Sequence, residues 1–365
     1  MKRKKKKKLR RILWITAASL ALLSALFFFL ASHLASRLSS QQEAQRWQGE
    51  SDLAFSQVSC FIPVDEKLSL NQIYSFREQV QKALHEASVD VKYSGQLQLD
   101  AWSTTGKVAV STDLGKGEAR VIVVGGDFFQ FHPLWLCSGN YISESDVMKD
   151  RVLLDEDLAW LLFGGTELTG MQLKINGIPF VVAGVVQREQ DLFNRRAYTD
   201  GMGLFMSFDA YKQLNTDAGI DCYELVMGEP VDGFALKLAR EKFPIGRGEI
   251  IQNTDRFTFS RLWDIVFAYG TRSMQTRGII YPYWENACRS AEDECALFML
   301  LGFLFAVFPA VMIIRACING LRRGKEKLTE DIIPGISDRV GEAVRVRQRR
   351  SWERKQEKRG KHEIR

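Results

Sequence analysis

Hydrophobic residues gather in two long uncharged runs near the two ends of the chain, Ile12–Leu30 and Ala296–Ile314. Each run has 19 residues, and at ~1.5 Å per helical residue each is about long enough to cross a hydrocarbon layer of ~30 Å. The pattern predicts one transmembrane helix over residues 12–32 and a second over residues 296–314. A large, mostly polar segment lies between them, so we expect a domain on one side of a membrane and both chain ends on the other.

The first half of the polar segment changes between helical and strand periodicity. Residues 33–52 hold good helix formers and no proline, so we expect the first membrane helix to continue outward as a stalk. A strand is predicted over Leu53–Ile62, and Ser69 with Gln72 fits a capping box that starts a helix. The apolar face of that helix recurs at helical spacing: Ile73, Phe76, Val80, Leu84 and Ala87. Strict alternation over residues 91–102 then predicts a half-buried strand.

Local signals define further elements in the second half. Val121–Val124 is a continuous apolar run that predicts a buried strand, and it ends at a sharp turn, Gly125-Gly126. Asp155 can cap a short helix over Glu156–Phe163. Asn176-Gly177 predicts a type I′ turn between two strands. The apolar residues of that hairpin are expected on one face: Leu173, Ile175, Ile178, Phe180 and Val182. Further strands are expected at Leu204–Met206 and Leu225–Met227, and a helix with Phe234, Leu238 and Ala239 after Pro230.

The last part of the polar segment, residues 256–295, should lead back to the membrane as a return stalk. We expect Tyr281, Tyr283 and Trp284 within it to rest at the level of the outer headgroups. Aromatic side chains with a polar edge favour that interface.

These patterns predict an α+β protein that crosses the membrane twice. The expected order along the chain is a basic N-terminus (1–11), the first transmembrane helix (12–32), a stalk (33–52), an extracytoplasmic core domain (53–255), a return stalk (256–295), the second transmembrane helix (296–314) and a charged tail (315–365). The core is large enough for two lobes. In the tail, a helix near residues 338–358 and a disordered segment both fit the composition.

The distribution of charge predicts the orientation in the membrane. Residues 1–11 carry nine Lys/Arg and no acid, residues 315–365 carry 16 Lys/Arg against eight Asp/Glu, and the middle carries 25 against 36. Because Lys and Arg resist translocation, both termini should be cytoplasmic and the central domain outside the cell membrane. A cleavable signal peptide is the alternative for the first run, but its apolar stretch exceeds the usual ~7–15 residues and a second run follows. The run Lys4–Lys8 directly precedes a membrane helix, which favours anionic membrane lipid over nucleic acid as its partner.

Six cysteines do not form a disulfide scaffold in a chain of this length. Cys317 is expected inside, and five others are expected outside: Cys60, Cys137, Cys222, Cys288 and Cys295. On one helix, Cys288 and Cys295 would be about 10.5 Å apart along the axis, which is too far for a disulfide. We expect buried free thiols, although an odd number outside also permits a pair between chains.

No catalytic, cofactor-binding or metal-binding motif is present in the sequence, so we predict a protein that is not an enzyme and expect no cofactor. The nearest lookalike of a phosphate-binding loop, Gly320–Glu326, has the wrong spacing and a Glu where Ser or Thr should hold Mg²⁺. Five acids lie close together in the sequence: Glu144, Asp146, Asp155, Glu156 and Asp157. Helix capping and solvated positions explain them better than a cation site. Likewise, His132-Pro133 fits a turn better than a metal ligand. A membrane-tethered hydrolase is the least favoured alternative.

Successive motifs between Val121 and Val185 carry a more specific signal. They read Val121-Ile-Val-Val-Gly-Gly-Asp127-Phe128-Phe129, Gly139-Asn-Tyr-Ile-Ser-Glu-Ser-Asp146, Arg151-Val-Leu-Leu-Asp-Glu-Asp-Leu-Ala-Trp-Leu-Leu-Phe163-Gly-Gly165 and Gly170-Met-Gln-Leu-Lys-Ile-Asn-Gly-Ile-Pro-Phe-Val-Val-Ala-Gly-Val185. This succession resembles the MacB-like periplasmic core domain of the FtsX-like ABC-transporter permease family. Members have a strand, a Gly-x-Asp-Tyr/Phe-Phe turn, an Ala-x-x-Leu-Phe-Gly helix and a Gly-x-x-Pro-Phe-x-Val-x-Gly-Val hairpin in the same order. In that family the domain also follows the first membrane helix directly.

The resemblance implies a two-lobed ectodomain. A βαβ-type lobe would consist of about residues 53–124 and 204–255, and a mainly-β lobe of about residues 125–203 would be inserted in it. It also implies a permease subunit, usually a homo- or heterodimer, that works with a separate cytoplasmic ABC ATPase. The outer domain of such a subunit transmits motion of the membrane helices to cargo or partner proteins.

The sequence departs from the family pattern after the ectodomain. Family permeases carry three membrane helices there, whereas this sequence shows one and then a charged tail. Either a separate multi-span permease subunit supplies the missing helices and the contact with the ATPase, or the chain is a two-pass receptor or scaffold that reuses the ectodomain without transport. Pro309 would kink the second membrane helix, either as a hinge or without a role.

Overall fold

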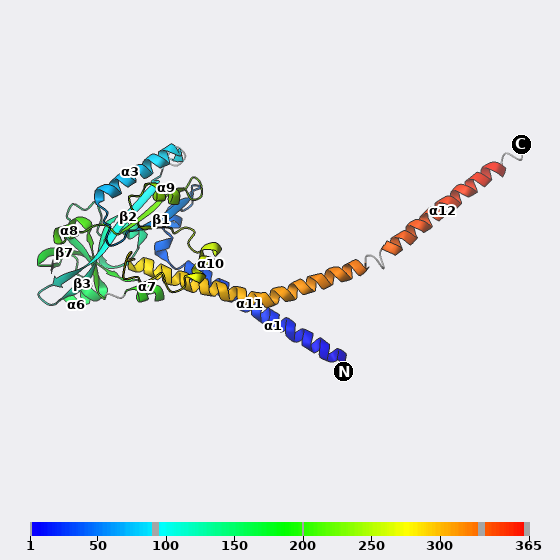
Figure 1. Cartoon of the computed structure of the whole chain (residues 1–365), viewed down its shortest axis with the longest axis horizontal. Coiled ribbons are helices and arrows are strands. Elements are labelled where there is room, and N and C mark those ends of the chain that lie inside the picture. Colours follow the sequence, from blue (N-terminus) through cyan, green and yellow to red (C-terminus); the bar gives the residue numbers. More distant parts are fainter. Residues whose placement is uncertain (1, 90–94, 199–200, 328–332, 361–365) are drawn as a thin grey trace. The chain divides into compact units, whose positions relative to one another are not determined.

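The computed structural model describes residues 2–89, 95–198, 201–327 and 333–360. The chain forms two compact units, one of residues Met1–Phe27 with Leu301–Arg365 and one of residues Phe28–Leu300. The helices α1 (Lys2–Ala35) and α11 (Tyr283–Lys327) each run from one unit into the other (Figure 1).

The first unit holds the apolar parts of α1 and α11, together with the tail helix α12 (Ile333–Gly360). In the part of the chain that the structure describes, two helical stretches are long and apolar enough to cross a membrane, Lys4–Ala35 and Tyr283–Lys325. Both runs predicted from the sequence lie inside these stretches. The tail therefore contains a helix, one of the two alternatives that its composition allowed.

Within this unit, α1 and α11 contact each other through small and aromatic side chains. The Ser24 hydroxyl donates a hydrogen bond to the Gly302 carbonyl at 2.8 Å, and the rings of Phe27 and Phe305 stack with centroids 5.6 Å apart. A hydroxyl in an apolar segment needs such a partner because lipid offers none. Pro309 lies inside α11, as the sequence predicted.

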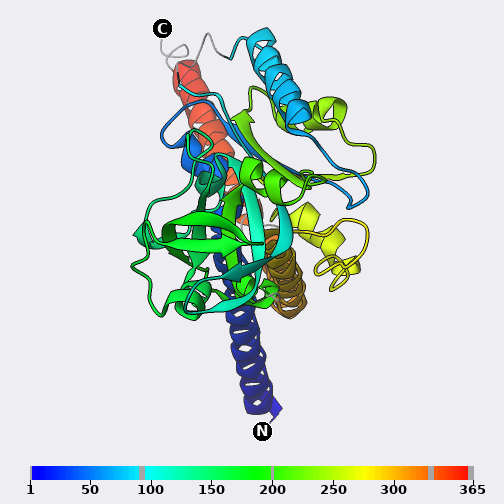
Figure 2. The ribbon, with the colours of Figure 1, turned by 90° about the vertical axis from the view of Figure 1, so that its left-hand side faces the viewer.

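The second unit is built on one mixed sheet of ten strands. The strands are β1 (Phe55–Phe61), β2 (Gln98–Ser111), β3 (Lys116–Gly126), β4 (Trp135–Gly139), β5 (Arg151–Asp155), β6 (Gln172–Ile175), β7 (Ile178–Gln187), β8 (Gly203–Ser207), β9 (Cys222–Gly228) and β10 (Glu249–Gln252). Their order is β10-β1-β9-β2-β3-β8-β5-β7-β4, and β6 pairs with both β2 and β7. The pairs β3–β8 and β5–β7 are parallel and the other named pairs are antiparallel. Figure 2 shows the long cyan hairpin of β2 and β3 between helix α3 and the green strands.

Helices cover both faces of this sheet. The shorter helices of this unit are η1 (Ser39–Gln41), α2 (Glu43–Gln48), α3 (Leu70–Glu86), α5 (Phe128–Phe131), α6 (Glu156–Phe163), α7 (Leu192–Ala197), α8 (Phe208–Leu214), α9 (Phe234–Lys242) and α10 (Phe259–Phe267), and α10 packs against α1 and α11 instead of the sheet. Buried residues of α3, α6, α8 and α9 form one core with the first face of the sheet, and those of α2, α5, α7 and the start of α11 form a second core with the other face. The predicted α+β fold class between two membrane helices is confirmed.

Several local predictions are confirmed because short-range chemistry decides them. In α3 the Ser69 backbone N–H donates to the Gln72 side chain at 3.0 Å, which completes the capping box. The Asp155 carboxylate accepts from the Leu158 N–H at 2.7 Å and so caps α6. Asn176 and Gly177 have φ of 48° and 85°, as a type I′ turn requires. The predicted strands at 53–62, 121–124, 204–206 and 225–227 and the helix after Pro230 are also present, with shifted ends.

The predicted half-buried strand over residues 91–102 was wrong in extent and in burial. Residues 90–94 lie outside the described residues, and β2 runs from Gln98 to Ser111. Asp100 and Trp102 are 5% and 2% exposed, because helices cover both faces of the sheet here. Past the turn at the end of β3, Gly126 has φ of 62°, and a Cβ there would lie 2.3 Å from the Asp100 carbonyl oxygen. Only glycine fits this close approach.

The expected continuous stalk after the first membrane helix was also wrong. Helix α1 ends at Ala35, and the chain turns through η1 and α2 before it enters β1. Leu38 and Ala44 are buried in the second core, so tertiary packing overrides the helix propensity of this segment. The division of the domain into two lobes stays a prediction.

The aromatic residues of the return segment do not rest at a headgroup level. Tyr281, Tyr283 and Trp284 are 4%, 3% and 2% exposed and belong to the second core of the domain. Burial against the sheet gains more from their large apolar surface than a wet interface would. A smaller correction concerns Ile178, which is 40% exposed at the end of its hairpin instead of sharing the buried face.

Candidate functional site at the junction of the sheet and the second membrane helix

The first turns of α11 are built into the domain, although the same helix continues as the second membrane helix. Its buried face at the sheet is made of Trp284, Ala287, Cys288 and Ala291, each exposed by 2% or less. These positions recur at helical spacing, and three of the four side chains are small. Small side chains let the helix backbone approach the sheet closely.

A buried network of charges fixes the same helix from the side. Arg256, which follows β10, donates two hydrogen bonds to the Glu285 carboxylate at 2.7 Å each and one to Glu292 at 2.5 Å. Arg289 donates to Glu285 at 2.5 Å and to Glu249 of β10 at 2.7 Å. The side chains of Arg256, Glu285, Glu292 and Arg289 are between 1% and 4% exposed. Three of the five residues lie on α11, and the other two tie them to the edge strand of the sheet.

The network is balanced in charge. Arg272 donates to the second oxygen of Glu292, so three arginines face three glutamates. Removing charges from water has a large energetic cost, which good geometry roughly offsets. Such a network therefore adds little net stability, but the loss of one member leaves an unpaired buried charge. We expect this network to specify one position of α11 against the sheet.

The end of the first membrane helix reaches the same face of the domain. The Gln41 side chain accepts a hydrogen bond from Arg256 at 3.3 Å, and the Cys295 thiol donates to the Ala31 carbonyl at 3.4 Å. Gln57 of β1 donates to the Ser40 carbonyl at 2.7 Å. The segment that follows α1 is thus held at the sheet, and α1 itself contacts α11.

A second buried pair lies next to Trp284. His132, at the end of α5, has its Nε2 2.5 Å from a carboxylate oxygen of Glu224 on β9, and both side chains are at most 2% exposed. The rings of His132 and Trp284 have centroids 4.3 Å apart. His132 does stand at a turn, as its sequence suggested, but it also links α5, β9 and α11.

Further along the same face, Glu189 accepts hydrogen bonds from the hydroxyls of Tyr198 at 2.8 Å and Tyr283 at 3.2 Å. Burial raises the pKa of Glu189, and the two hydroxyls oppose this shift. Nearby, burial also raises the pKa of Asp155 despite its contact with the Arg188 guanidinium. Both carboxyls serve contacts between elements.

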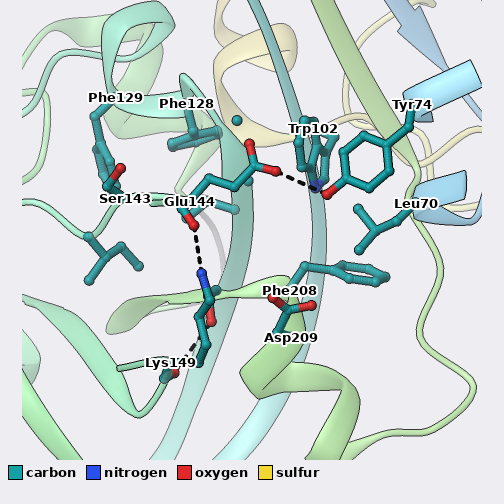
Figure 3. Close-up of a pocket in the computed structure, with 15 residues that line it drawn as sticks. Leu70, Tyr74, Trp102, Phe128, Phe129, Ser143, Glu144, Lys149, Phe208 and Asp209 are labelled. Atoms are coloured by element: carbon teal, nitrogen blue, oxygen red, sulfur yellow. Dashed lines mark hydrogen bonds between the residues drawn. The ribbon is translucent and has the colours of Figure 1, made fainter. Parts of the chain in front are cut away.

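A pocket opens between α3, the end of β3, the loop at residues 142–149 and α8 (Figure 3). The Tyr74 hydroxyl donates to Glu144 at 3.0 Å, and Lys149 donates to the Glu144 carbonyl at 2.6 Å. Trp102, Phe128 and several other aromatic residues form the walls. The cavity of ≈ 30 Å³ has room for about one or two water molecules, so it does not fit a drug-sized ligand.

The acids that the sequence singled out are spread over separate contacts. Glu144 lies at this pocket, Asp155 caps α6 and contacts Arg188, and Asp146 accepts from the Ser143 N–H at 2.9 Å. Glu156 accepts from Gln187 at 3.3 Å. Across the described ranges no three His, Cys, Asp or Glu side chains are placed to hold a metal ion together. All six cysteines are free, and Cys60, Cys222, Cys288 and Cys295 are buried as predicted.

Sequence comparison identifies the family of the sheet-based domain, over a range that ends before the charged residues of the junction. The model of one family, the MacB-like periplasmic core domain, matches residues 36–242, which is more than half of the chain. The chain belongs to this family. The resemblance predicted from residues 121–185 is confirmed, and the match extends from the end of α1 to the end of α9. This MacB-like protein thus has a periplasmic-type domain of the ABC-transporter permease family.

Three solved structures are similar to parts of this MacB-like protein. The extracellular domain of the noncanonic ABC-type transporter YknZ from Gram-positive bacteria aligns with 14% identity, covers 52% of this chain and 92% of its own, and has a TM-score of 0.36. The periplasmic region of MacB from Actinobacillus actinomycetemcomitans aligns with 17% identity, 54% and 89% coverage and a TM-score of 0.38. A domain of a putative permease protein from Porphyromonas gingivalis aligns with 14% identity, 54% and 87% coverage and a TM-score of 0.32. None of the curated proteins matches the sequence significantly.

The residues of the junction escaped the sequence analysis of this MacB-like protein. The sequence placed Glu249 in the core domain and Arg256 with the charged residues of α11 in the return stalk, and it predicted no contact between them. One signal was present: Glu285, Arg289 and Glu292 recur at i, i+4 and i+7 beside a row of small apolar residues. This pattern predicts an amphipathic helix with its Ala/Cys row toward a core, but it does not predict that the charged row is buried as well.

Proposed function

We propose that the chain is a non-enzymatic, permease-like membrane subunit of an ABC-type export or mechanotransmission system. Membership of the MacB-like family supports the assignment to this class of membrane protein. The observation that supports the mechanical part is the junction, where buried charges of α11 pair with the buried Arg256 and with the partly exposed Glu249 of β10. A displacement of α11 would then be transmitted directly to the strands and would not be absorbed by a flexible linker.

The direction of the proposed coupling follows from the charge distribution. Both termini are cytoplasmic in this proposal, because residues 1–11 and 315–365 are strongly basic. The sheet-based domain then lies outside the cell membrane and contacts cargo or partner proteins. The energy would come from a separate ABC ATPase, and a multi-span permease subunit would supply its docking site, in a homo- or heterodimer.

Co-purification tests this proposal. The affinity-tagged full-length chain is isolated from gently solubilised membranes, and its companions are identified by mass spectrometry. We expect an ABC ATPase and a multi-span permease in amounts comparable to the bait. An equally abundant two-span membrane protein with the same tag is the control. If neither companion exceeds its level in the control, the transport role is refuted.

A receptor or scaffold is the second candidate function, and the tail supports it. Residues 333–360 form the helix α12 after the second membrane helix, and the sequence there is rich in Arg, Lys and Glu. Such a helix suits docking of a cytoplasmic protein. Deletion of residues 333–360 discriminates: a receptor that signals through α12 loses its downstream response, whereas a transport subunit keeps its ATPase and permease companions.

A further inference from the structure

Helix α10 carries a row of exposed aromatic side chains that the junction does not use. Trp263 is 42% exposed and Phe267 is 79% exposed, and the rings of Phe259, Trp263 and Phe267 follow one another with centroids 6.1 Å apart. The spacing of four residues places the three on one side of the helix. Exposed apolar patches of this kind mark sites of contact with a protein or a membrane.

The other apolar side of α10 shows where this row lies. Leu262 and Ile265 are 6% and 4% exposed and pack in one cluster with Ala31 of α1 and with Ala296 and Met299 of α11. Ala31 stands at the outer end of the first apolar run, and Ala296 begins the second. Two independent membrane helices therefore mark the same boundary, and α10 contacts both of them there.

The polar side of α10 borders an open groove next to the junction. Arg261 and Asp264 line this groove together with Arg256, Arg272 and Glu292 of the junction. At 3.6 residues per turn these two side chains lie away from the aromatic row. The helix thus has one side on the ends of the membrane helices, one next to the charged junction, and an aromatic side that is exposed.

We propose that α10 lies in the outer membrane interface and that its aromatic side inserts among phospholipid headgroups and the adjoining acyl chains. A helix with aromatic residues on one side and charged residues on another binds at that depth, about 5–10 Å into the boundary region. Indole rings favour it because they combine apolar surface with an N–H donor. The inference requires that α1 and α11 span a bilayer, as in the proposed function, but it does not require transport. Through α10 the bilayer would then contact the side of the domain that carries the junction.

Lipid quenching of tryptophan fluorescence tests the inference in the full-length chain. The protein is reconstituted into phosphatidylcholine vesicles with or without bromine atoms near the headgroup end of the acyl chains. The signal of each tryptophan is taken as the difference between wild type and its Trp→Phe variant. For Trp263→Phe we expect that the lost signal is quenched roughly twofold or more by the brominated lipid, because bromine quenches only at contact depth.

Two native tryptophans are matched controls. Trp14 lies inside the first apolar run and is 39% exposed, so its signal should be quenched if α1 spans the bilayer. Trp135 on β4 is 75% exposed, and its signal should not change. Quenching of Trp14 without quenching of Trp263 overturns the inference and leaves the membrane topology intact. If the fluorescence of Trp14 is not quenched by the brominated lipid, α1 does not span the bilayer, and the inference about α10 is wrong as well.

A second pair of variants is needed in case the fluorescence of Trp263 is too weak to measure. In the Trp263→Phe background, Phe267→Trp moves the reporter to the most exposed ring of the row, and Leu114→Trp places it on an equally exposed site, 78%, in the β2–β3 hairpin. The first variant should be quenched by brominated lipid and the second should not. If the Trp at 267 is shielded from aqueous iodide but untouched by the lipid bromine, a protein covers this side and the inference is wrong.

Discussion

At the scale of single residues, the buried carboxyl of Asp221 shows how the fold changes the acidity of a side chain. Asp221, at the start of β9, accepts a hydrogen bond from the Thr104 hydroxyl of β2 at 2.9 Å. Burial raises the pKa of this carboxyl from 3.8 to about 7, and the hydrogen bond from Thr104 opposes the shift. The folded state therefore holds a proton that the unfolded chain has released.

This proton makes the stability depend on pH in a definite direction. Between pH 3.8 and about 7 the folded state binds more protons than the unfolded state, so the free energy of unfolding contributed by Asp221 falls as pH rises through that window. The variant Asp221→Asn cannot ionise and still accepts from Thr104. Below the window it should match wild type, and above it should be more stable by about 1–3 kcal/mol.

Thermal unfolding of the full-length protein in detergent, followed by circular dichroism at several pH values, measures this difference. If the free energy of unfolding changes equally with pH in wild type and in Asp221→Asn between pH 3.8 and about 7, the pKa of Asp221 is not raised.

At the scale of elements, the buried charges of the junction define how α11 sits on the sheet. The variant Glu285→Gln keeps the shape of the side chain but leaves Arg256 and Arg289 without their shared carboxylate. We expect a loss of about 3–5 kcal/mol in the free energy of unfolding, because an unpaired buried charge is not solvated. The measurement is thermal or denaturant unfolding in detergent at neutral pH.

The control for this variant removes a charge pair of the same type from the surface. Lys237 and Glu241 lie at i and i+4 on α9, 3.9 Å apart, and are 75% and 55% exposed. Glu241→Gln should change stability by about 0.5 kcal/mol or less. A similar, small effect of both variants would mean that water reaches the junction and that the network does not fix the helix.

Elements also show how far sequence reasoning reaches. The capping box of α3, the cap of α6 and the turn at Asn176 were predictable, because residues within four positions of one another decide them. The burial of both faces of β2 was not, since it depends on helices distant in the sequence. The same holds for the junction: Arg256 and Glu285 meet only after the sheet edge and α11 pack together.

At the scale of the whole molecule, length and hydropathy alone predicted the two helices that can span a membrane. The order of the motifs predicted the family. The side on which the domain lies rests on charge asymmetry and is still a prediction. One native residue can test it. Cys317 is an exposed free thiol three residues after the second apolar run, whereas Cys60, Cys222, Cys288 and Cys295 are buried and Cys137 is partly buried.

Labelling with a membrane-impermeant maleimide in a Cys137→Ser background reports the orientation. If both termini are cytoplasmic, Cys317 reacts in inverted membrane vesicles and not in intact spheroplasts, because Lys and Arg near the helix ends hold them inside. Ser351→Cys, in the exposed part of α12, should behave like Cys317. Leu114→Cys, 78% exposed in the β2–β3 hairpin, should react in intact spheroplasts instead. The reverse pattern would place the sheet-based domain in the cytoplasm, where it could contact an ATPase directly but not extracytoplasmic cargo, and the proposed coupling through α11 would have to run the other way.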